Sequence, residues 1–285
     1  MKCAWKELMT MVPPKYREFV DRHRTDVQEI RLRIGQSPQL IGCNHSGSKQ
    51  VPATQEDLNW CVNAASRYSP WTASGAAEGY VTGPGGHRIG LCGDSVIRDG
   101  NITGIHRFTS LCIRVARDFP GIATGLEKLD GSVLILGRPG GGKTTLLRDL
   151  IRNRGQKECI CVVDERRELF PDSGCFEKET GVDVLSGCPK KEGIEILLRT
   201  MGPDCIAVDE ITSEADTQAL CAAAWCGVRL LATAHASSVE DLLRRKVYRP
   251  LWESGLFEHA VILLPDKSWI TERLDQRCSS GSVRY

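Results

Sequence analysis

The sequence feature that most constrains the fold is a glycine-rich segment between a hydrophobic run and an amphipathic one. Val133 to Leu136 are continuously apolar, which is typical of a strand buried on both faces of a sheet. The pattern Gly-x-x-x-x-Gly-Lys-Thr follows at 137–144, and leucines then recur at helical spacing in 146–150. A strand, a glycine loop and a helix in this order predict an α/β fold whose loop binds phosphate.

Each part of this segment has a physical role in holding a nucleoside triphosphate. Glycines let backbone N–H groups turn toward phosphate oxygens, and the helix N-terminus adds its dipole and free N–H groups. Lys143 can reach the terminal phosphates, and the Thr144 hydroxyl can ligate Mg²⁺. No Asn/Thr-Lys-x-Asp guanine signature follows a strand, so we expect ATP rather than GTP. The expected ATP- and Mg²⁺-binding residues are Gly137, Arg138, Pro139, Gly140, Gly141, Gly142, Lys143, Thr144 and Thr145.

Two later apolar runs end in polar residues that suit nucleotide chemistry. Residues 205–208 are followed by Asp209 and Glu210, and residues 228–233 lead to His235. In an open α/β sheet, ligands bind at the carboxyl ends of the strands. We expect Asp209 to hold Mg²⁺, Glu210 to polarise the attacking water, and His235 to hydrogen-bond that water or the γ-phosphate. A chance acidic pair and a buried structural histidine fit the same residues, but the phosphate loop favours the functional interpretation.

A third apolar run, residues 158–163, ends in Asp164-Glu-Arg-Arg-Glu168. This segment fits either a solvated loop or a ligand-facing strand end, and the nearby phosphate loop favours the second. Residues 172–188 are rich in Gly, Ser, Asp and Cys and predict a long loop. Residues 241–249 predict a helix with a basic face, for which we favour solvation over a role in binding partners.

The first part of the chain predicts a smaller α+β domain. Alternating apolar residues indicate strands at 30–34 and 111–115, and a capping-box-like start indicates a helix over 54–66. The glycines of 83–93 are flanked by apolar residues at strand spacing, and no helical pattern follows them. They therefore predict a β-hairpin rather than a second phosphate loop.

Composition and charge narrow the classes of function. The 285 residues suffice for one large or two modest domains, and the net charge of +1 gives no global attraction to nucleic acid or an anionic membrane. Residues 1–20 are charged throughout, unlike a secretory signal, and no apolar run approaches the roughly 20 residues that span a bilayer. We expect a cytoplasmic protein that reaches membranes only peripherally, through partners. Its 13 cysteines then belong in the core rather than in disulfides or metal sites.

Together these segments resemble the stage III sporulation protein AA family over nearly the whole chain. The matching segments are 29–33, 83–93, 113–117, 137–149, 162–168, 203–211 and 232–235. The glycine hairpin and the Asp-Glu-Arg-x-Glu motif are much more specific than the phosphate loop, which many families share. The family is a branch of the additional-strand P-loop ATPases and is related to hexameric type II and type IV secretion ATPases.

The resemblance implies a ring of six subunits that hydrolyses ATP held between neighbours. We expect a smaller α+β domain at 1–110, followed at 111–285 by a RecA-like P-loop ATPase domain with a mainly parallel sheet. In such rings, arginines of the N-terminal domain often face the nucleotide of the neighbouring subunit. The positions that could serve here are Arg88, Arg114 and Arg117.

The resemblance also implies roles for two site residues and for the assembly. Glu168 matches the last position of the acidic box of secretion ATPases and His235 matches their histidine box, which implies that both position water and sense the γ-phosphate. The family is thought to energise a channel complex of small membrane proteins between mother cell and forespore. This implies a peripheral location at the membrane that faces the forespore.

The chain departs from the family pattern at one position, and two other functions remain as alternatives. Relatives usually carry an arginine two or three residues after the Walker B glutamate, whereas Thr212 and Ser213 stand here. An ATP-dependent nucleic-acid-binding protein would draw its charge from 27–34 and 241–249, but the near-zero net charge and the lack of interleaved aromatics speak against it. A nucleotide-gated scaffold that hydrolyses little is the other alternative.

Overall fold

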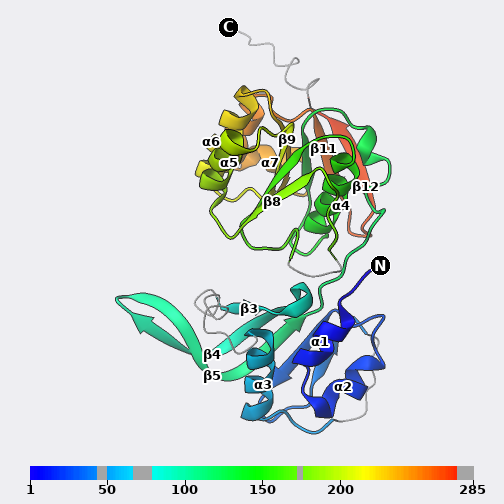
Figure 1. Ribbon diagram of the computed structural model, residues 1–285, viewed down its shortest axis with the longest axis vertical. Coiled ribbons are helices and arrows are strands. Elements are labelled where there is room, and N and C mark those ends of the chain that lie inside the picture. Colours follow the sequence, from blue (N-terminus) through cyan, green and yellow to red (C-terminus); the bar gives the residue numbers. More distant parts are fainter. Residues whose placement is uncertain (44–49, 67–78, 172–175, 275–285) are drawn as a thin grey trace. The chain divides into compact units, whose positions relative to one another are not determined.

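The structure is a computed structural model that describes residues 1–43, 50–66, 79–171 and 176–274 (Figure 1). The chain forms two compact units, one of Met1–Asp118 with Pro171–Phe176 and one of Phe119–Phe170 with Glu177–Tyr285. The division after Asp118 lies later than the expected boundary at residue 110, because the strand that ends at Arg114 pairs within the sheet of the first unit.

The first unit is an antiparallel sheet with helices packed on one face (Figure 1). The strand order is β2-β1-β5-β4-β3. The alternation in β1 buries Ile30 and Leu32 against helical residues such as Leu8 and Tyr16, which confirms the strand and its predicted inner face. The first helix was not predicted. The elements are α1 (Trp5–Met11), α2 (Pro14–Asp21), β1 (Glu29–Arg33), β2 (Gln39–Ile41), α3 (Gln55–Ser66), β3 (Tyr80–Thr82), β4 (Arg88–Arg98) and β5 (Asn101–Arg114).

The glycine-rich segment 83–93 forms the predicted hairpin. Strands β3 and β4 pair antiparallel around the Gly-Pro-Gly-Gly turn, in which Gly85 and Gly86 have φ of 77° and 74°. Strands β4 and β5 then continue beyond the sheet as a long ribbon that turns at Asp99 and Gly100 (Figure 1). The sequence predicted the hairpin at 83–93 and a strand at 111–115, but not the ribbon that joins them.

The second unit is a seven-stranded sheet of order β12-β11-β6-β10-β9-β7-β8. All neighbouring strands are parallel except the β11–β12 pair, which confirms the predicted mainly parallel sheet. The strands are β6 (Val133–Leu136), β7 (Ile160–Asp164), β8 (Val182–Ser186), β9 (Cys205–Glu210), β10 (Arg229–Ala234), β11 (His259–Leu263) and β12 (Trp269–Arg273). The helices are α4 (Lys143–Gly155), α5 (Lys190–Thr200), α6 (Glu214–Trp225), α7 (Val239–Arg244) and α8 (Arg249–Glu253).

Helices cover both faces of this sheet, which explains the continuous apolar run of β6 (Figure 1). Leu134 and Leu136 belong to the core on the side of α5 and α6, whereas Val133 and Ile135 belong to the core on the side of α4. All four side chains are buried, and each contributes about 1.5–3 kcal/mol of transfer free energy. The β6 strand and the phosphate loop that follows it are therefore firmly anchored.

Two sequence predictions in this unit were wrong in extent. Residues 182–186, expected within a long loop, form the edge strand β8. Only Val182 of this strand is buried, so the segment lacks a clear alternation of buried and exposed residues. Residues 172–175 of that expected loop lie outside the described ranges. The helix expected over 241–249 ends at Arg244, because Arg245 is extended and Tyr248 is buried, its hydroxyl donating to the Ile211 carbonyl (3.1 Å). No helix within the described ranges is long and apolar enough to cross a membrane.

Candidate nucleotide-binding site

The phosphate loop joins the end of β6 to the start of α4. Gly140 and Gly142 have φ of +70° and +104°, a conformation that favours glycine, and the space around each is open. The Gly141 N–H donates to the Arg138 carbonyl over 3.0 Å, which closes the loop. Helix α4 begins at Lys143, so the first N–H groups of its N-terminus, with Thr144 and Thr145, have no partners within the helix. These features fit the predicted anion site.

Lys143 meets the histidine at the end of β10. Its ammonium lies 2.8 Å from Nδ1 of His235 and donates to the Arg138 carbonyl over 3.2 Å. Nε2 of His235 lies 2.7 Å from Oε1 of Glu210, at the end of β9. Because the ammonium can only donate, Nδ1 accepts and Nε2 carries the hydrogen that Glu210 accepts. Burial lowers the pKa of Lys143, and the Glu210 and Asp209 carboxylates partly offset this shift.

Thr144 and Asp209 meet beside this chain of hydrogen bonds. The Thr144 hydroxyl donates to Oδ1 of Asp209 over 3.1 Å. Desolvation of the Asp209 carboxyl group raises its pKa to about 7, with the neighbouring Glu168 carboxylate adding to the shift. A hydroxyl and crowded carboxylates are hard oxygen donors of the kind that Mg²⁺ prefers, so the residues present fit this ion.

The acidic segment 164–168 folds back at the carboxyl end of β7. The buried Asp164 carboxylate accepts the N–H groups of Glu168 (2.8 Å), Leu169 (3.1 Å) and Phe170 (2.8 Å). Asp164 thus shapes the segment, and the carboxylates of Glu168 and, to a smaller extent, Asp164 both raise the pKa of Asp209. The motif therefore contributes both local structure and negative charge near Asp209.

Arg148 on α4 holds the same segment from the other side, and the sequence analysis missed it. Its guanidinium donates to the carbonyl of Glu168 over 2.7 Å and to the carbonyl of Leu169. The side chain is buried, although its sequence position among charged residues of an amphipathic helix resembles that of a solvated residue. An arginine five residues after the phosphate-loop lysine was the only available signal.

The three arginines expected to act across a subunit boundary have different surroundings in the first unit. Arg88 and Arg114 are directly opposite each other on β4 and β5. The Arg88 guanidinium lies 3.6 Å from the ring centroid of Tyr80, and Arg114 is 3.4 Å from Glu29. Arg117 instead donates to the backbone carbonyls of residues 24, 25 and 27. The structure brings the first two together and engages the third in local structure.

Thr212 and Ser213 form the cap of α6. The Asp216 carboxylate accepts both of their N–H groups, over 2.9 and 3.1 Å, and the Ser213 hydroxyl accepts the Asp216 N–H over 3.1 Å. This capping box occupies the positions at which the family resemblance led us to look for an arginine.

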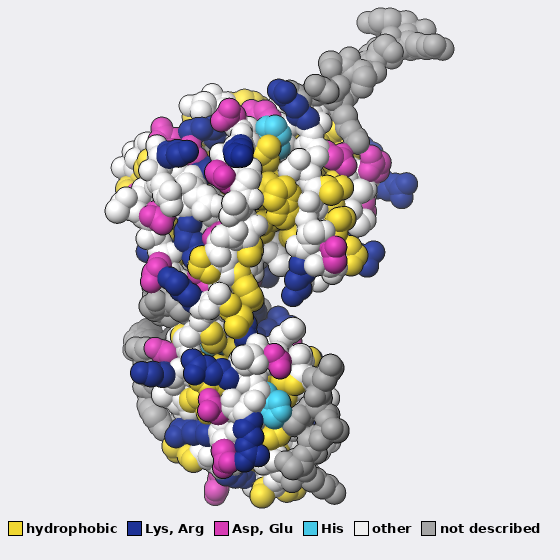
Figure 2. Space-filling model, turned by 90° about the vertical axis from the view of Figure 1, so that its right-hand side faces the viewer, with side chains coloured by type: hydrophobic (Ala, Val, Ile, Leu, Met, Phe, Trp, Pro, Cys, Tyr) yellow, Lys and Arg dark blue, Asp and Glu magenta, His cyan; other side chains and the backbone are white. Residues whose placement is uncertain are grey.

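The surface charge is mixed. On the face shown in Figure 2, Lys and Arg side chains are interspersed with Asp and Glu on each unit rather than gathered into one basic area. This distribution agrees with the net charge of +1.

Solved structures show the fold to be that of RecA-like secretion and motor ATPases. The X-ray structure of the Legionella pneumophila ATPase DotB matches with a TM-score of 0.59 at 16% identity, covering 94% of this chain and 84% of that one. The crystal structure of the pilus retraction motor PilT with bound ADP matches with a TM-score of 0.58 at 15% identity, covering 89% of this chain and 80% of that one.

Sequence comparison is more specific. The family model "Sporulation stage III, protein AA" matches residues 6–272. "Stage III sporulation protein AA" of Bacillus subtilis (strain 168) is 36% identical over 259 residues, which covers 85% of this chain and 83% of that protein. The uncharacterized protein ycf45 of Cyanidium caldarium is 30% identical over 200 residues, 65% of this chain and 58% of that protein. The chain therefore belongs to the stage III sporulation protein AA family.

Proposed function

We propose that the protein is a Mg²⁺-dependent ATPase whose second unit carries the hydrolytic site. The observation that supports this most strongly is the hydrogen-bonded chain Lys143–His235–Glu210 beside the Thr144–Asp209 pair. These residues come from the loop after β6 and from the ends of β10 and β9, which are neighbours in the sheet. A phosphate-binding lysine and two strand-end acids thus share one edge, as phosphoryl transfer to water requires.

The proposed roles follow from the contacts. The loop residues 137–145 hold the phosphates, with Lys143 at the terminal ones, and Thr144 and Asp209 hold Mg²⁺. When bound, Mg²⁺ neutralises charge that develops on the phosphate oxygens. Glu210 accepts a proton from the attacking water, and His235 orients Glu210 through its Nε2–H. We also propose that Glu168 helps to position the water.

The contact between Lys143 and His235 suggests how the site responds to nucleotide. The ammonium donates to Nδ1 of His235, so the oxygens of a bound phosphate would compete with the imidazole for the same donor. Once Lys143 turns to the phosphates, Nδ1 is released and the imidazole can reorient together with Glu210. This exchange would let the end of β10 sense the γ-phosphate.

We propose that the active form is a ring, a hexamer by analogy with the related secretion ATPases, completed by arginines of a neighbouring subunit. Arg88 and Arg114 are the candidates, because they lie opposite each other on adjacent strands. Arg117 is the weaker candidate, since its guanidinium binds three backbone carbonyls. A substitution of Arg117 would therefore act mainly through the stability of the first unit.

The family and the name of the Bacillus subtilis relative support a role in sporulation. We propose that ATP hydrolysis powers the assembly of, or transport through, a channel complex between mother cell and forespore. The partners would be small membrane proteins, and the ATPase would be cytoplasmic and peripheral at the membrane facing the forespore. Nucleic acid is a poor candidate partner, given the net charge of +1 and the mixed surface charge (Figure 2).

A direct test is phosphate release by the full-length chain at increasing protein concentration. Each assay is run with Mg²⁺ and again after a chelator has removed the Mg²⁺. We expect turnover per chain to rise as rings form and to vanish on chelation. Absence of turnover in the assembled ring would favour a nucleotide-gated scaffold instead. That second candidate draws support from Thr212 and Ser213, which cap α6 where relatives usually carry an arginine.

A further inference from the structure

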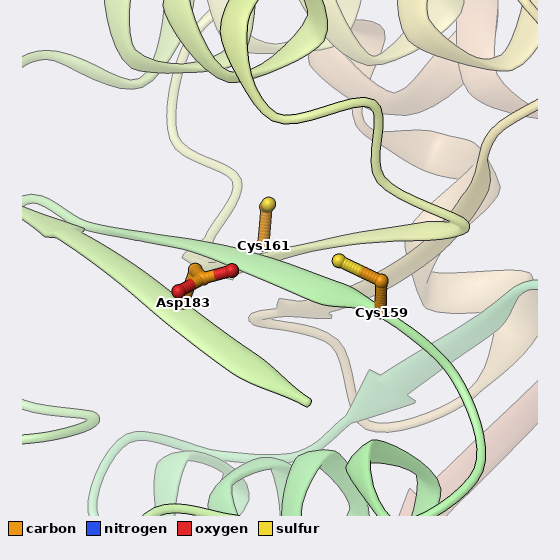
Figure 3. A group of neighbouring side chains, drawn as sticks. All are labelled: Cys159, Cys161 and Asp183. Carbon is orange, nitrogen blue, oxygen red and sulfur yellow. The ribbon is translucent and has the colours of Figure 1, made fainter. Parts of the chain in front are cut away.

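Two cysteines and an aspartate lie together in the second unit, away from the phosphate loop. The two Sγ atoms of Cys159 and Cys161 and a carboxylate oxygen of Asp183 all lie within 4.8 Å of one another. Figure 3 shows the two cysteine side chains on one side of β7, with the aspartate on the adjacent strand β8. The ligand atoms thus come from two paired strands.

Strand geometry explains why these side chains converge. Residues two apart in a strand point to the same face, which brings Cys159, just before β7, onto the face of Cys161. Cys161 pairs in register with Asp183 of β8, so the third side chain lies directly across the ladder. Because the sequence pattern predicted a loop at residue 183, this convergence becomes visible only in the structure.

The backbone holds two of the three positions firmly. The Cys159 N–H donates to the Asp204 carboxylate over 2.9 Å, and its carbonyl accepts the N–H groups of Asp204 and Cys205 over 3.0 and 3.2 Å. Gly181, at the start of β8, accepts the Ile160 N–H over 2.8 Å. A Cβ at residue 181 would lie 2.3 Å from the Gly155 carbonyl oxygen. Only glycine therefore lets the backbone at residue 181 lie this close to residue 155, and this position fixes where β8 begins and where Asp183 lies.

The chemistry of the three groups favours a soft cation over a disulfide. Cβ atoms two residues apart in a strand are about 6.6 Å apart, whereas a disulfide needs about 3.5–4.5 Å. Zinc bonds of about 2.3 Å to sulfur and about 2.0–2.2 Å to oxygen place tetrahedral ligands about 3.4–3.8 Å apart. The ligand atoms, already within 4.8 Å, would reach this spacing by small side-chain rotations.

We propose that Cys159, Cys161 and Asp183 bind a divalent cation of the zinc class, with the fourth position open to solvent. Cys161 is buried, Cys159 is partly exposed and Asp183 is exposed, so the ion has a path from solvent to the inner thiol. The two soft thiolate sulfurs favour such a cation over the hard Mg²⁺, which prefers oxygen ligands.

The proton balance of binding is defined. Each thiol that becomes a thiolate ligand releases its proton to solvent, with no change of redox state. The bound ion would fasten the edge strand β8 to β7 at the amino end of β7, whereas the phosphate loop lies at the carboxyl ends of the strands.

The test is titration of the reduced full-length protein with Co²⁺, followed by displacement with Zn²⁺. We expect a thiolate-to-cobalt charge-transfer band that saturates, proton release on binding, and a melting temperature that rises with Zn²⁺ concentration. The double variant C159S/C161S should lose one bound metal per chain and the band. The matched control C92S/C226S removes two exposed thiols and should retain both.

Asp183→Asn supplies an independent variant, because residue 183 is exposed on an edge strand and the substitution preserves its shape. We expect Co²⁺ affinity to fall at least about 10-fold while the thiolate band remains. A wild-type band in C159S/C161S, or no thiolate band in the reduced wild type, would overturn the site. Unchanged affinity in Asp183→Asn would contradict the proposed ligand set. ATP binding serves only as the check that each variant is folded.

Discussion

Lys143 and His235 are direct hydrogen-bond partners, with the lysine ammonium 2.8 Å from Nδ1 of the imidazole. The contact links the phosphate loop to the end of β10, and the second imidazole nitrogen continues it to Glu210 over 2.7 Å. A single histidine therefore connects the group proposed to bind phosphate to the group proposed to activate water. Its removal should separate nucleotide binding from hydrolysis.

His235→Ala should retain ATP binding and lose turnover. Without the imidazole, Lys143 still reaches the phosphates, but Glu210 loses the donor that orients it. We expect kcat to fall about 100-fold with little change in KM, as measured by steady-state phosphate release. His106→Ala, at an exposed position of the β4–β5 ribbon, is the matched control and should behave as wild type. An equal loss in both variants would contradict the assignment.

Arg148→Ala should lower both the stability of the second unit and the rate of ATP hydrolysis. The substitution leaves the buried carbonyls of Glu168 and Leu169 without their charged donor. Loss of such hydrogen bonds costs about 1.5–3 kcal/mol each, visible as a lower midpoint of urea unfolding. As a positioning residue, Arg148 should affect kcat more than KM. Partial recovery of kcat in Arg148→Lys would support that role, and wild-type kcat in Arg148→Ala would exclude it.

Gly142→Ala tests the backbone conformation of the phosphate loop, because the added methyl group would clash with no neighbouring atom. A Cβ at residue 142 meets nothing within 4 Å, but the backbone has φ of +104°. We expect a conformational cost of about 1–3 kcal/mol and weaker ATP binding, measured by calorimetry. Gly104→Ala is the control, since its surroundings are equally open and no positive φ is required there. Equal ATP affinities in the two variants would rule out a strained loop.

The first unit should lose stability in acid through His87. This imidazole is buried, its Nε2 lies 2.9 Å from the Ala4 carbonyl, and its Nδ1 accepts the Ala116 N–H over 3.0 Å. Burial lowers its pKa below the ordinary value, so the unfolded chain binds the proton more readily than the folded one. The stabilising contribution should be complete above about pH 6.5 and lost progressively below it.

His87→Gln provides the comparison for that pH dependence. Glutamine cannot be protonated in this range, so the variant should show a flatter profile of unfolding free energy between about pH 7 and 5. Parallel profiles for wild type and variant would show that other groups cause the acid loss. The two profiles would be obtained by urea unfolding at each pH.

The sequence predicted much of the second unit because its signals are local. The run Val133 to Leu136, the glycines before Lys143 and the acids that end β9 each depend on a few adjacent residues. Parallel strands have their carboxyl ends at the same edge of the sheet. Residues that are far apart in the sequence could therefore be assigned to one site.

The rest depended on tertiary contacts that local patterns do not encode. The short edge strand β8, in which only Val182 is buried, is a strand because it pairs with β7. The prediction of a loop at these residues hid the partner of Cys161. Arg148 is indistinguishable from a solvated helix residue until the carbonyls it binds are placed. Arg117, matched by family resemblance alone, proves to bind the backbone of residues 24–27.

The most direct test of the proposed function is the Glu210→Gln protein, assayed for ATP binding and for phosphate release beside the wild type and Lys143→Ala. Glutamine keeps the size of the side chain but cannot take a proton from water. We predict that Glu210→Gln binds ATP and releases phosphate at least about 100-fold more slowly than wild type, and that Lys143→Ala does not bind. Phosphate release at the wild-type rate by Glu210→Gln would contradict the proposed mechanism.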